Sequence, residues 1–128
     1  MNKLIIDAAK NKIFLMIINK DDNYSITHEN TKNNYEKLTL LIKEFLDKKK
    51  INFKNISQIY VNRGPGSFAG IRNSLSIVKA FHLSNKVDYY CFSFDDFKEK
   101  NEVKYENIPK LCEKFKVEKN LINPIYLG

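Results

Sequence analysis

Residues 62–72, NRGPGSFAGIR, are the part of the chain whose residue types and spacing could do chemistry. They contain both arginines, Arg63 and Arg72, and three of the four glycines. Ser67 is a good N-cap for a helix that begins at Phe68. Because backbone N–H groups at a helix start can bind an anion, this stretch could form a phosphate or carboxylate cradle flanked by two guanidinium groups.

The same stretch also has a purely structural interpretation. Gly64, Pro65 and Gly66 are typical of a tight turn, and Gly70 would let the helix pack closely on a strand. The spacing lacks the Lys-Ser/Thr pair of a phosphate-binding loop and differs from a dinucleotide fingerprint. Both interpretations stay open from the residues alone. So does the question of whether the two arginines contact an anion, an acidic residue of this chain or a partner.

The other reactive residues do not assemble into a catalytic pattern. His28 and His82 have no acid at a diagnostic spacing, and Ser67 has no accompanying base. Cys91 lies in an apolar run, and neither Cys91 nor Cys112 has the spacing of a zinc site or a disulfide scaffold. We therefore expect no catalytic residue, no metal ligand and no cofactor.

Length and composition limit the class of protein. A chain of 128 residues with 43% hydrophobic residues suits one folded domain. No apolar run reaches the roughly 18 residues of a membrane span, and Asp7 comes too early for a signal peptide, so we expect a cytoplasmic protein without a membrane partner. The net charge of +7 would attract RNA, although nearly all of the 22 basic residues are lysines spread along the chain.

The elements that must position these residues follow from hydrophobic periodicity. Strands are predicted over residues 4–7, 13–19, 24–28, 56–62 and 89–92, and helices from Asn33 or Asn34 to about Lys50, from Phe68 to Leu83 and over residues 108–115. A three-stranded meander followed by helix-crossed strands indicates a mixed sheet with helices, an α/β layer structure of the ribonuclease-H-like kind.

Both long helices are predicted to carry more apolar surface than one sheet would cover. In the first helix, Leu40 lies outside the main apolar stripe. The second helix has one stripe that includes Ile71 and another formed by Ile77 and Phe81. A wide apolar face on such a domain suggests a protein partner.

The string RGPGSFAGIR resembles the signature GRGPGSFTGIR of the TsaB family, also called YeaZ. Family members are partner subunits in the bacterial threonylcarbamoyladenosine (t6A) modification of tRNA. Nine of the ten positions from Arg63 to Arg72 agree, and Ala69 stands where the family usually has Thr. The order of strands and helices agrees as well, so the resemblance covers about residues 3–97 and returns in the last five residues.

The resemblance implies an actin-like, ribonuclease-H-like lobe over residues 1–97, with residues 98–128 as a short remnant of a second lobe. It also implies a non-catalytic subunit that pairs with TsaD, the catalytic paralogue, and is joined by the ATPase TsaE. Such a subunit supports transfer of the threonylcarbamoyl group to tRNA adenosine, with tRNA contacted indirectly, and can form a homodimer through the same helical face.

The chain departs from the family pattern at several positions. Asp7-Ala8-Ala9 replaces the usual Asp-Thr-Ser, Asn34-Tyr35 replaces His-Ser, and Gly128 replaces a terminal Arg. Without a hydroxyl donor or glycine after the first strand, and without a full second lobe to close a cleft, we expect that ATP chemistry has been lost.

Two sets of site residues follow. The motif and possible anion-site residues are Arg63, Gly64, Pro65, Gly66, Ser67, Phe68, Gly70 and Arg72, and the partner-interface candidates are Tyr35, Leu38, Ile42, Phe45, Ser74, Ile77 and Phe81. Two alternative functions remain: an independent glycoprotease-like or nucleotide-binding enzyme, and a direct tRNA-binding module.

Overall fold

The computed structural model describes residues 2–20, 22–99 and 101–126, which form a five-stranded mixed sheet in the order β3-β2-β1-β4-β5. The strands are β1 (Asn2–Asp7), β2 (Lys12–Asn19), β3 (Asp22–Glu29), β4 (Ile56–Asn62) and β5 (Asp88–Phe92). The first three strands form an antiparallel meander, and β1, β4 and β5 run parallel. This arrangement confirms the mixed α/β architecture predicted from the sequence.

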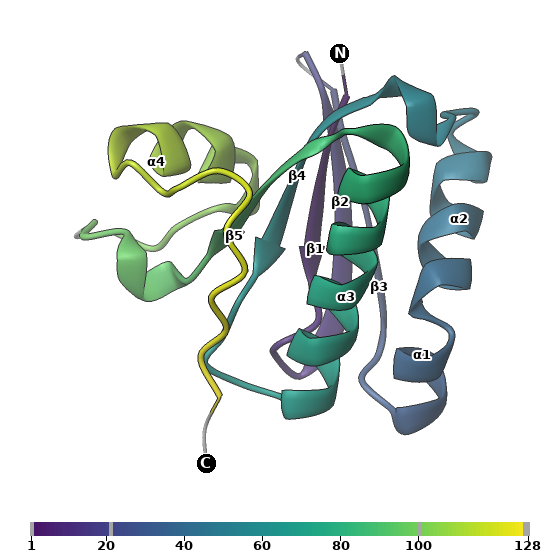
Figure 1. Cartoon of the computed structure of the whole chain (residues 1–128), viewed down its shortest axis with the longest axis horizontal. Coiled ribbons are helices and arrows are strands. Elements are labelled where there is room, and N and C mark those ends of the chain that lie inside the picture. Colours follow the sequence, from purple (N-terminus) through teal and green to yellow (C-terminus); the bar gives the residue numbers. More distant parts are fainter. Residues whose placement is uncertain (1, 21, 100, 127–128) are drawn as a thin grey trace.

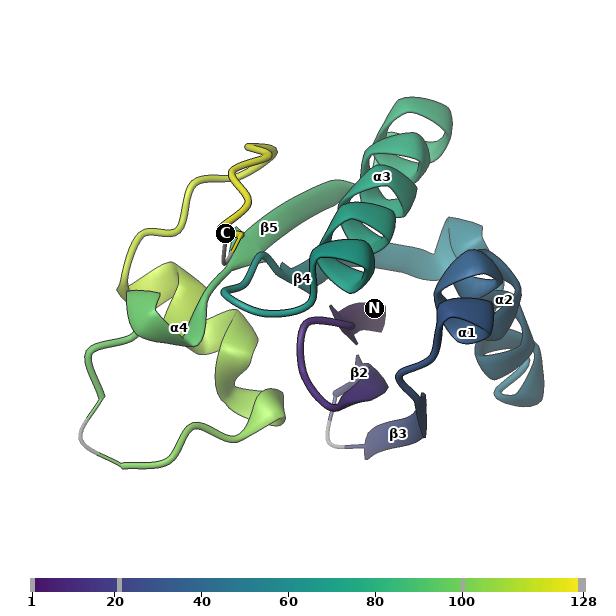
Figure 2. The same ribbon diagram turned by 90° about the horizontal axis from the view of Figure 1, so that it is seen from below.

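The two faces of the sheet are covered by different helices (Figure 1; Figure 2). Helices α1 (Lys32–Glu36), α2 (Leu38–Lys48) and α3 (Phe68–Asn85) lie on one face, and α4 (Ile108–Lys114) lies on the other. Three 3₁₀ turns, Phe53–Asn55, Phe94–Asp96 and Tyr105–Asn107, complete the elements. The result is a three-layer structure with the sheet in the middle.

The strands of the meander are longer than their apolar runs. Lys12 pairs with Glu29 at one end of the β2/β3 hairpin, and Asn19 pairs with Asp22 at the other. The polar residues at both ends therefore join the ladder, because backbone pairing does not require apolar side chains. An ion pair between Lys12 and Glu29 accompanies this pairing.

The first predicted helix is two helices. Thr31, and neither Asn33 nor Asn34, is the N-cap of α1, since its side chain accepts a hydrogen bond of 3.2 Å from the Asn34 backbone N–H. The Asn34 side chain instead donates to the Glu29 carbonyl at 2.7 Å. That bond ties the helix start to the end of β3, so the asparagine is not available as a cap.

The larger core lies between the sheet and α1, α2 and α3. Its buried residues include Leu4 and Ile6 of β1, Ile42 of α2 and Val78 of α3. The main apolar stripes of α2 and α3, which include Ile42 and Val78, are buried here, and this hydrophobic burial stabilises the layer.

A second core lies on the opposite face of the sheet, beneath α4. Tyr105 contributes to it, because its ring stacks on Phe14 with centroids 4.0 Å apart and its hydroxyl donates to the Asp7 carboxylate at 2.6 Å. Asp7 is fully buried at the end of β1 and also accepts a bond from the Ala9 N–H at 3.1 Å. The 105–117 segment is thus fastened to the sheet by a hydrogen bond to a buried carboxylate.

Removing the Tyr105 hydroxyl tests this attachment. Tyr105→Phe should lower the free energy of unfolding by about 2 kcal/mol, because a buried carboxylate loses a hydrogen-bond donor. Urea denaturation, monitored by circular dichroism, measures the change. Tyr126→Phe, which removes the hydroxyl of an exposed ring, is the control. Equal stability of the two variants would contradict the role given to the hydroxyl.

The same hydroxyl predicts a loss of stability in alkali. Burial, followed by the negative charge of Asp7, raises the pKa of Tyr105 above its ordinary value of 10.0. The folded state therefore holds this proton more tightly than the unfolded state, and stability falls as the pH rises above about 10. Tyr105→Phe should show a shallower fall in urea midpoint over that pH range.

Candidate functional site

The glycine-rich stretch forms the corner between the end of β4 and the start of α3. Ser67 caps α3 as predicted, since its hydroxyl accepts a hydrogen bond of 3.2 Å from the Gly70 N–H. The Tyr35 hydroxyl lies 2.8 Å from the same oxygen, which links α1 to this corner. The backbone N–H of Ser67 donates to the Ala9 carbonyl at 2.9 Å, so the turn is also bonded to the β1/β2 hairpin.

Close backbone contacts explain the glycines at 66 and 70. A Cβ at Gly66 would overlap the Ala9 carbonyl oxygen, and a Cβ at Gly70 would overlap the Ala8 carbonyl oxygen. Neither carbonyl can move freely, because both belong to the turn after β1. These glycines therefore allow α3 to begin directly against the hairpin.

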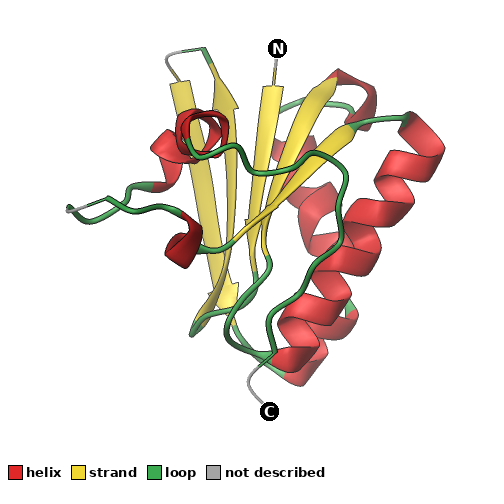
Figure 3. Cartoon of the chain, turned by 60° about the vertical axis from the view of Figure 1, so that its left-hand side comes forward, coloured by secondary structure: helices red, strands yellow, loops and turns green. Residues whose placement is uncertain are grey.

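Gly64 is required for a different reason. Its φ of +109° lies in a region that residues with a side chain rarely adopt. A Cβ there would also overlap the carbonyl oxygen of Ile125, which belongs to the C-terminal segment. The C-terminal segment thus lies against the corner through backbone contact, as its course in Figure 3 shows.

Arg63 contacts an acidic residue of its own chain. Its Nη2 lies 2.7 Å from Asp96 Oδ1, its Nε donates to Oδ2 at 3.3 Å, and its Nη1 donates to the Asn123 carbonyl at 3.1 Å. The Arg63 side chain is 15% exposed. Among the three partners left open by the sequence, the structure supplies the internal carboxylate, which occupies the Nε/Nη2 edge of the guanidinium.

The remaining motif residues face solvent. Arg72 is exposed on α3, and Pro65 is exposed in the turn. Phe68 is 55% exposed and lies against the Tyr126 ring, with centroids 4.7 Å apart. Of the two arginines that could flank an anion, Arg63 is thus paired inside the chain and Arg72 is exposed.

Four of the seven interface candidates are in the core. Leu38, Ile42, Phe45 and Ser74 are each at most 3% exposed. They were expected on an uncovered helix face, because helical periodicity reveals an apolar stripe but not the elements that pack against it. The sheet and the neighbouring helix cover this stripe, so Ile42, Phe45 and Ser74 are not free to contact a partner while the chain stays folded.

The other three candidates, Tyr35, Ile77 and Phe81, are half-buried, and the first two lie beside a groove. Tyr35, Leu38 and Ile77 line a cavity of about 300 Å³ between α1, the start of α2 and the middle of α3, together with the exposed Thr39 and Ser76. Phe81 packs on Phe53 with centroids 4.7 Å apart. A charge at Phe81 would therefore disturb the core.

The buried thiols are unsuited to nucleophilic chemistry. Burial raises the pKa of both Cys91 and Cys112 to about 12, so the thiolate is scarce near neutral pH. His82 is engaged with the Val87 carbonyl at 2.9 Å. Within residues 2–20, 22–99 and 101–126, no three His, Cys, Asp or Glu side chains are grouped as metal ligands would be, and no helix is long and apolar enough to cross a bilayer.

Sequence reasoning missed two carboxylates with defined roles. Asp96 carries no signal in its local sequence, yet it pairs with Arg63 and accepts a hydrogen bond from the Ser93 N–H at 2.8 Å. Asp7 was noted as a strand end, yet it holds Tyr105. The available signal for Asp7 was its position at the end of an apolar strand, because an acid buried there needs a hydrogen-bond donor.

Three parallel strands extended by an antiparallel hairpin, with helices on both faces, define an actin-like, ribonuclease-H-like lobe. The structures of YeaZ from Pseudomonas aeruginosa and of a Pseudomonas aeruginosa protein described as similar to peptidase YEAZ share this fold. Each superimposes with a TM-score of 0.66 at 17% identity, covering 72% of this chain and 43% of the other.

Sequence comparison narrows the class to a family. The protein-family model described as TsaD, tRNA N6-adenosine threonylcarbamoyltransferase, matches residues 24–93, which is more than half of the 128-residue chain. The protein named tRNA threonylcarbamoyladenosine biosynthesis protein TsaB from Buchnera aphidicola subsp. Schizaphis graminum is 30% identical over 90 residues, covering 70% of this chain and 43% of the relative. Its namesake from Buchnera aphidicola subsp. Baizongia pistaciae is 29% identical over 80 residues, covering 62% and 36%.

The chain therefore belongs to the TsaD family, as a member of its TsaB (YeaZ) group. It spans less than half the length of the curated relatives it matches.

The close contact at Gly70 predicts a strong effect of one methyl group. Gly70→Ala should lower the free energy of unfolding by about 3 kcal/mol, because the added Cβ meets the Ala8 backbone and something must shift. Thermal or urea unfolding measures the change. Ser76→Ala, an exposed substitution on the same helix, should change stability by less than about 0.5 kcal/mol.

The Arg63 pair predicts a second loss of stability. Asp96→Asn should destabilise the fold by about 2 kcal/mol, since it leaves a poorly exposed guanidinium without its counter-charge. Asp47→Asn removes the exposed Lys43–Asp47 pair of 3.9 Å and should cost no more than about 0.5 kcal/mol. Matching effects in the two variants would show that Asp96 acts no differently from a surface charge.

Proposed function

We propose that the chain is a non-catalytic TsaB-type subunit that pairs with a TsaD-type transferase and supports t6A modification of tRNA. The observation that carries this proposal is the signature corner, residues 63–72, set on the expected fold in a chain related to proteins named for t6A biosynthesis. The cytoplasm is where such a reaction would take place.

The contacts of the corner favour a structural role over catalysis. Its glycines are needed for contacts with the Ala8, Ala9 and Ile125 backbone, and Arg63 is bound to Asp96. A corner held from inside in this way orients α3 with respect to the β1/β2 hairpin. The buried thiols, with pKa values of about 12, also argue against a cysteine nucleophile of the kind an independent peptidase would use.

We place the pairing surface at the groove between α1, α2 and α3. The groove has polar, exposed edges at Thr39 and Ser76 and an apolar floor that includes Ile77. Leu40 on α2 is a further apolar side chain on this helix and is 50% exposed. A partner helix laid on this surface would cover apolar side chains that the lobe itself leaves partly in water.

The same surface would serve a homodimer when no TsaD-type subunit is present, and a TsaE-type ATPase would join the heteromeric complex. In this proposal residues 98–128 are the remnant of a second lobe. Within this stretch, α4 (Ile108–Lys114) covers the sheet face opposite the pairing surface.

Charge at the groove edges tests the pairing surface. The double variant Thr39→Arg/Ser76→Arg should weaken binding to the cognate TsaD-type subunit at least about tenfold, because two bulky cations obstruct a shared face without entering the core. Co-purification and calorimetric titration of the two subunits measure the loss.

The matched control is Ser25→Arg/Thr27→Arg, which places the same charges on exposed positions of β3. It should bind the transferase subunit as the unmodified chain does. Absence of any complex at micromolar concentration with the unmodified chain would refute the proposed function itself, whereas equal binding by both double variants would refute only the location of the surface.

A further inference from the structure

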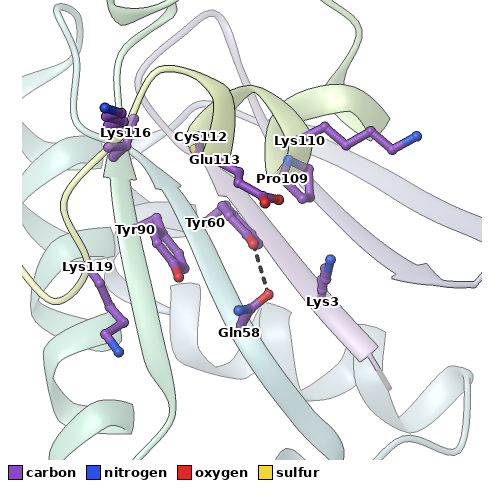
Figure 4. A pocket seen from close by; sticks show the side chains of 11 residues that line it. Lys3, Gln58, Tyr60, Tyr90, Pro109, Lys110, Cys112, Glu113, Lys116 and Lys119 are labelled. Carbon is purple, nitrogen blue, oxygen red and sulfur yellow. Dashed lines mark hydrogen bonds between the residues drawn. The ribbon is translucent and has the colours of Figure 1, made fainter.

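A second hollow lies on the face of the sheet that the signature corner does not use. It is a groove of about 500 Å³ between α4 and the strands β1, β4 and β5. Figure 4 shows the floor of the groove, which is formed by Tyr60, Gln58 and Tyr90 on the neighbouring strands β4 and β5. Glu113 of α4 lies on the opposite side of the groove. The volume is within the usual range of small-molecule sites.

The groove is strongly basic. Its charged lining residues are Lys3, Lys110, Lys116, Lys119 and the single acid Glu113. Of these lysines, only Lys119 has an ion pair within the described parts of the chain, with Asp88 at 3.7 Å. Figure 4 shows Lys110 and Lys119 extending outward from the rim, while Lys3 lies beside the floor. The positive charge is thus concentrated at the mouth, where it would meet an anion that enters.

The floor combines an aromatic wall with unused hydrogen-bonding groups. Tyr60 and Tyr90 stack nearly parallel, with centroids 5.0 Å apart and an interplanar angle of 10°. Burial raises the pKa of Tyr60, so its hydroxyl stays protonated and donates to Gln58 Oε1 at 2.9 Å. That bond orients the Gln58 amide and leaves its N–H₂ group as a donor. Neither this group nor the Tyr90 hydroxyl has a partner in the described part of the chain.

The set of groups fits one chemical class better than a simple anion. Rim lysines suit phosphate oxygens, and half-exposed Tyr90 offers an aromatic edge and a hydroxyl to a planar base. A carboxylate inside a basic groove is unfavourable for a bare phosphate, but it is an acceptor for sugar hydroxyls. Glu113 therefore distinguishes a ribose-bearing ligand from a polyanion without hydroxyl groups.

We propose that the groove beneath α4 binds a ribonucleoside phosphate, with the rim lysines on the phosphate, Glu113 on the ribose hydroxyls and the Tyr90 ring, stacked on the buried Tyr60, beside the base. The ligand can be a free nucleotide or a nucleotide of an RNA strand, since both present the same groups. Binding at this site requires no partner subunit, so its test is independent of the proposed pairing with a TsaD-type subunit.

The test uses the isolated full chain and two probes. Adenosine 5′-monophosphate is titrated by calorimetry, and a fluorescent single-stranded oligoadenylate by anisotropy. Saturable binding of the nucleotide alone identifies a free nucleotide as the ligand. Tighter, salt-dependent binding of the RNA identifies a strand, because each phosphate contact releases counterions. Absence of binding of both probes at millimolar concentration overturns the proposal.

Two double variants locate the binding. Lys110→Glu/Lys116→Glu should weaken binding of the responsive probe at least about tenfold, because it reverses two rim charges. Lys48→Glu/Lys79→Glu makes the same change in net charge at exposed positions on the helical face and should leave binding within about twofold. Equal losses in both variants overturn the site in favour of general charge attraction.

Two further measurements test the chemical class. Glu113→Gln should reduce the preference for the ribose probe over its deoxyribose counterpart, and Tyr90→Phe should weaken binding by a few fold while keeping the ring. Equal binding of the ribose and deoxyribose probes by the unmodified chain contradicts the role of Glu113. Displacement of the probe by polyglutamate at equal charge concentration would show that any polyanion is accepted, and would overturn the assignment.

Discussion

The fold depends on how closely the start of α3 approaches the β1/β2 hairpin. The carbonyl groups of Ala8 and Ala9 occupy the space where Cβ atoms of Gly70 and Gly66 would lie. Close packing of this kind has no tolerance for an added methyl group, since backbone cannot rotate away as a side chain can. The position of α3 also sets the position of α1, because the Tyr35 hydroxyl of α1 is hydrogen-bonded to Ser67 at the start of α3.

The two faces of the sheet have different kinds of chemistry. On the face covered by α1, α2 and α3, the main apolar stripes are buried in the core, and a shallow groove with polar edges lies between the three helices. On the α4 face, a smaller aromatic core lies beside a basic hollow. Burial on both faces explains why the central strand β1 is apolar along Leu4, Ile5 and Ile6, as expected for a strand covered on each side.

Much of the fold could be predicted from the sequence because its signals are local. Apolar runs gave the five strands, and Ser67 before Phe68 gave the start of α3. The site was harder, because its decisive contacts are distant in sequence: Arg63 and Asp96 are 33 residues apart, and Asp7 and Tyr105 are 98 apart. Periodicity also could not tell that the stripe of Leu38 and Phe45 faces inward, since the covering element is not encoded locally.

The C-terminal segment also changes what the sheet can do in assembly. Asn120 donates to the Tyr89 carbonyl at 2.8 Å, Lys119 forms an antiparallel bridge with Tyr90, and Ile125 donates to the Arg63 carbonyl at 2.7 Å. The Asn120 bond and the Lys119 bridge use groups on the outer side of β5 that an added strand would need, whereas the Ile125 bond fastens the segment to the residue after β4. Edge-to-edge growth of the sheet is thereby discouraged at β5, and the opposite edge, β3, carries mainly polar side chains such as Asn23 and Thr27. A sheet protected in this way favours association through helices over extension into larger sheets.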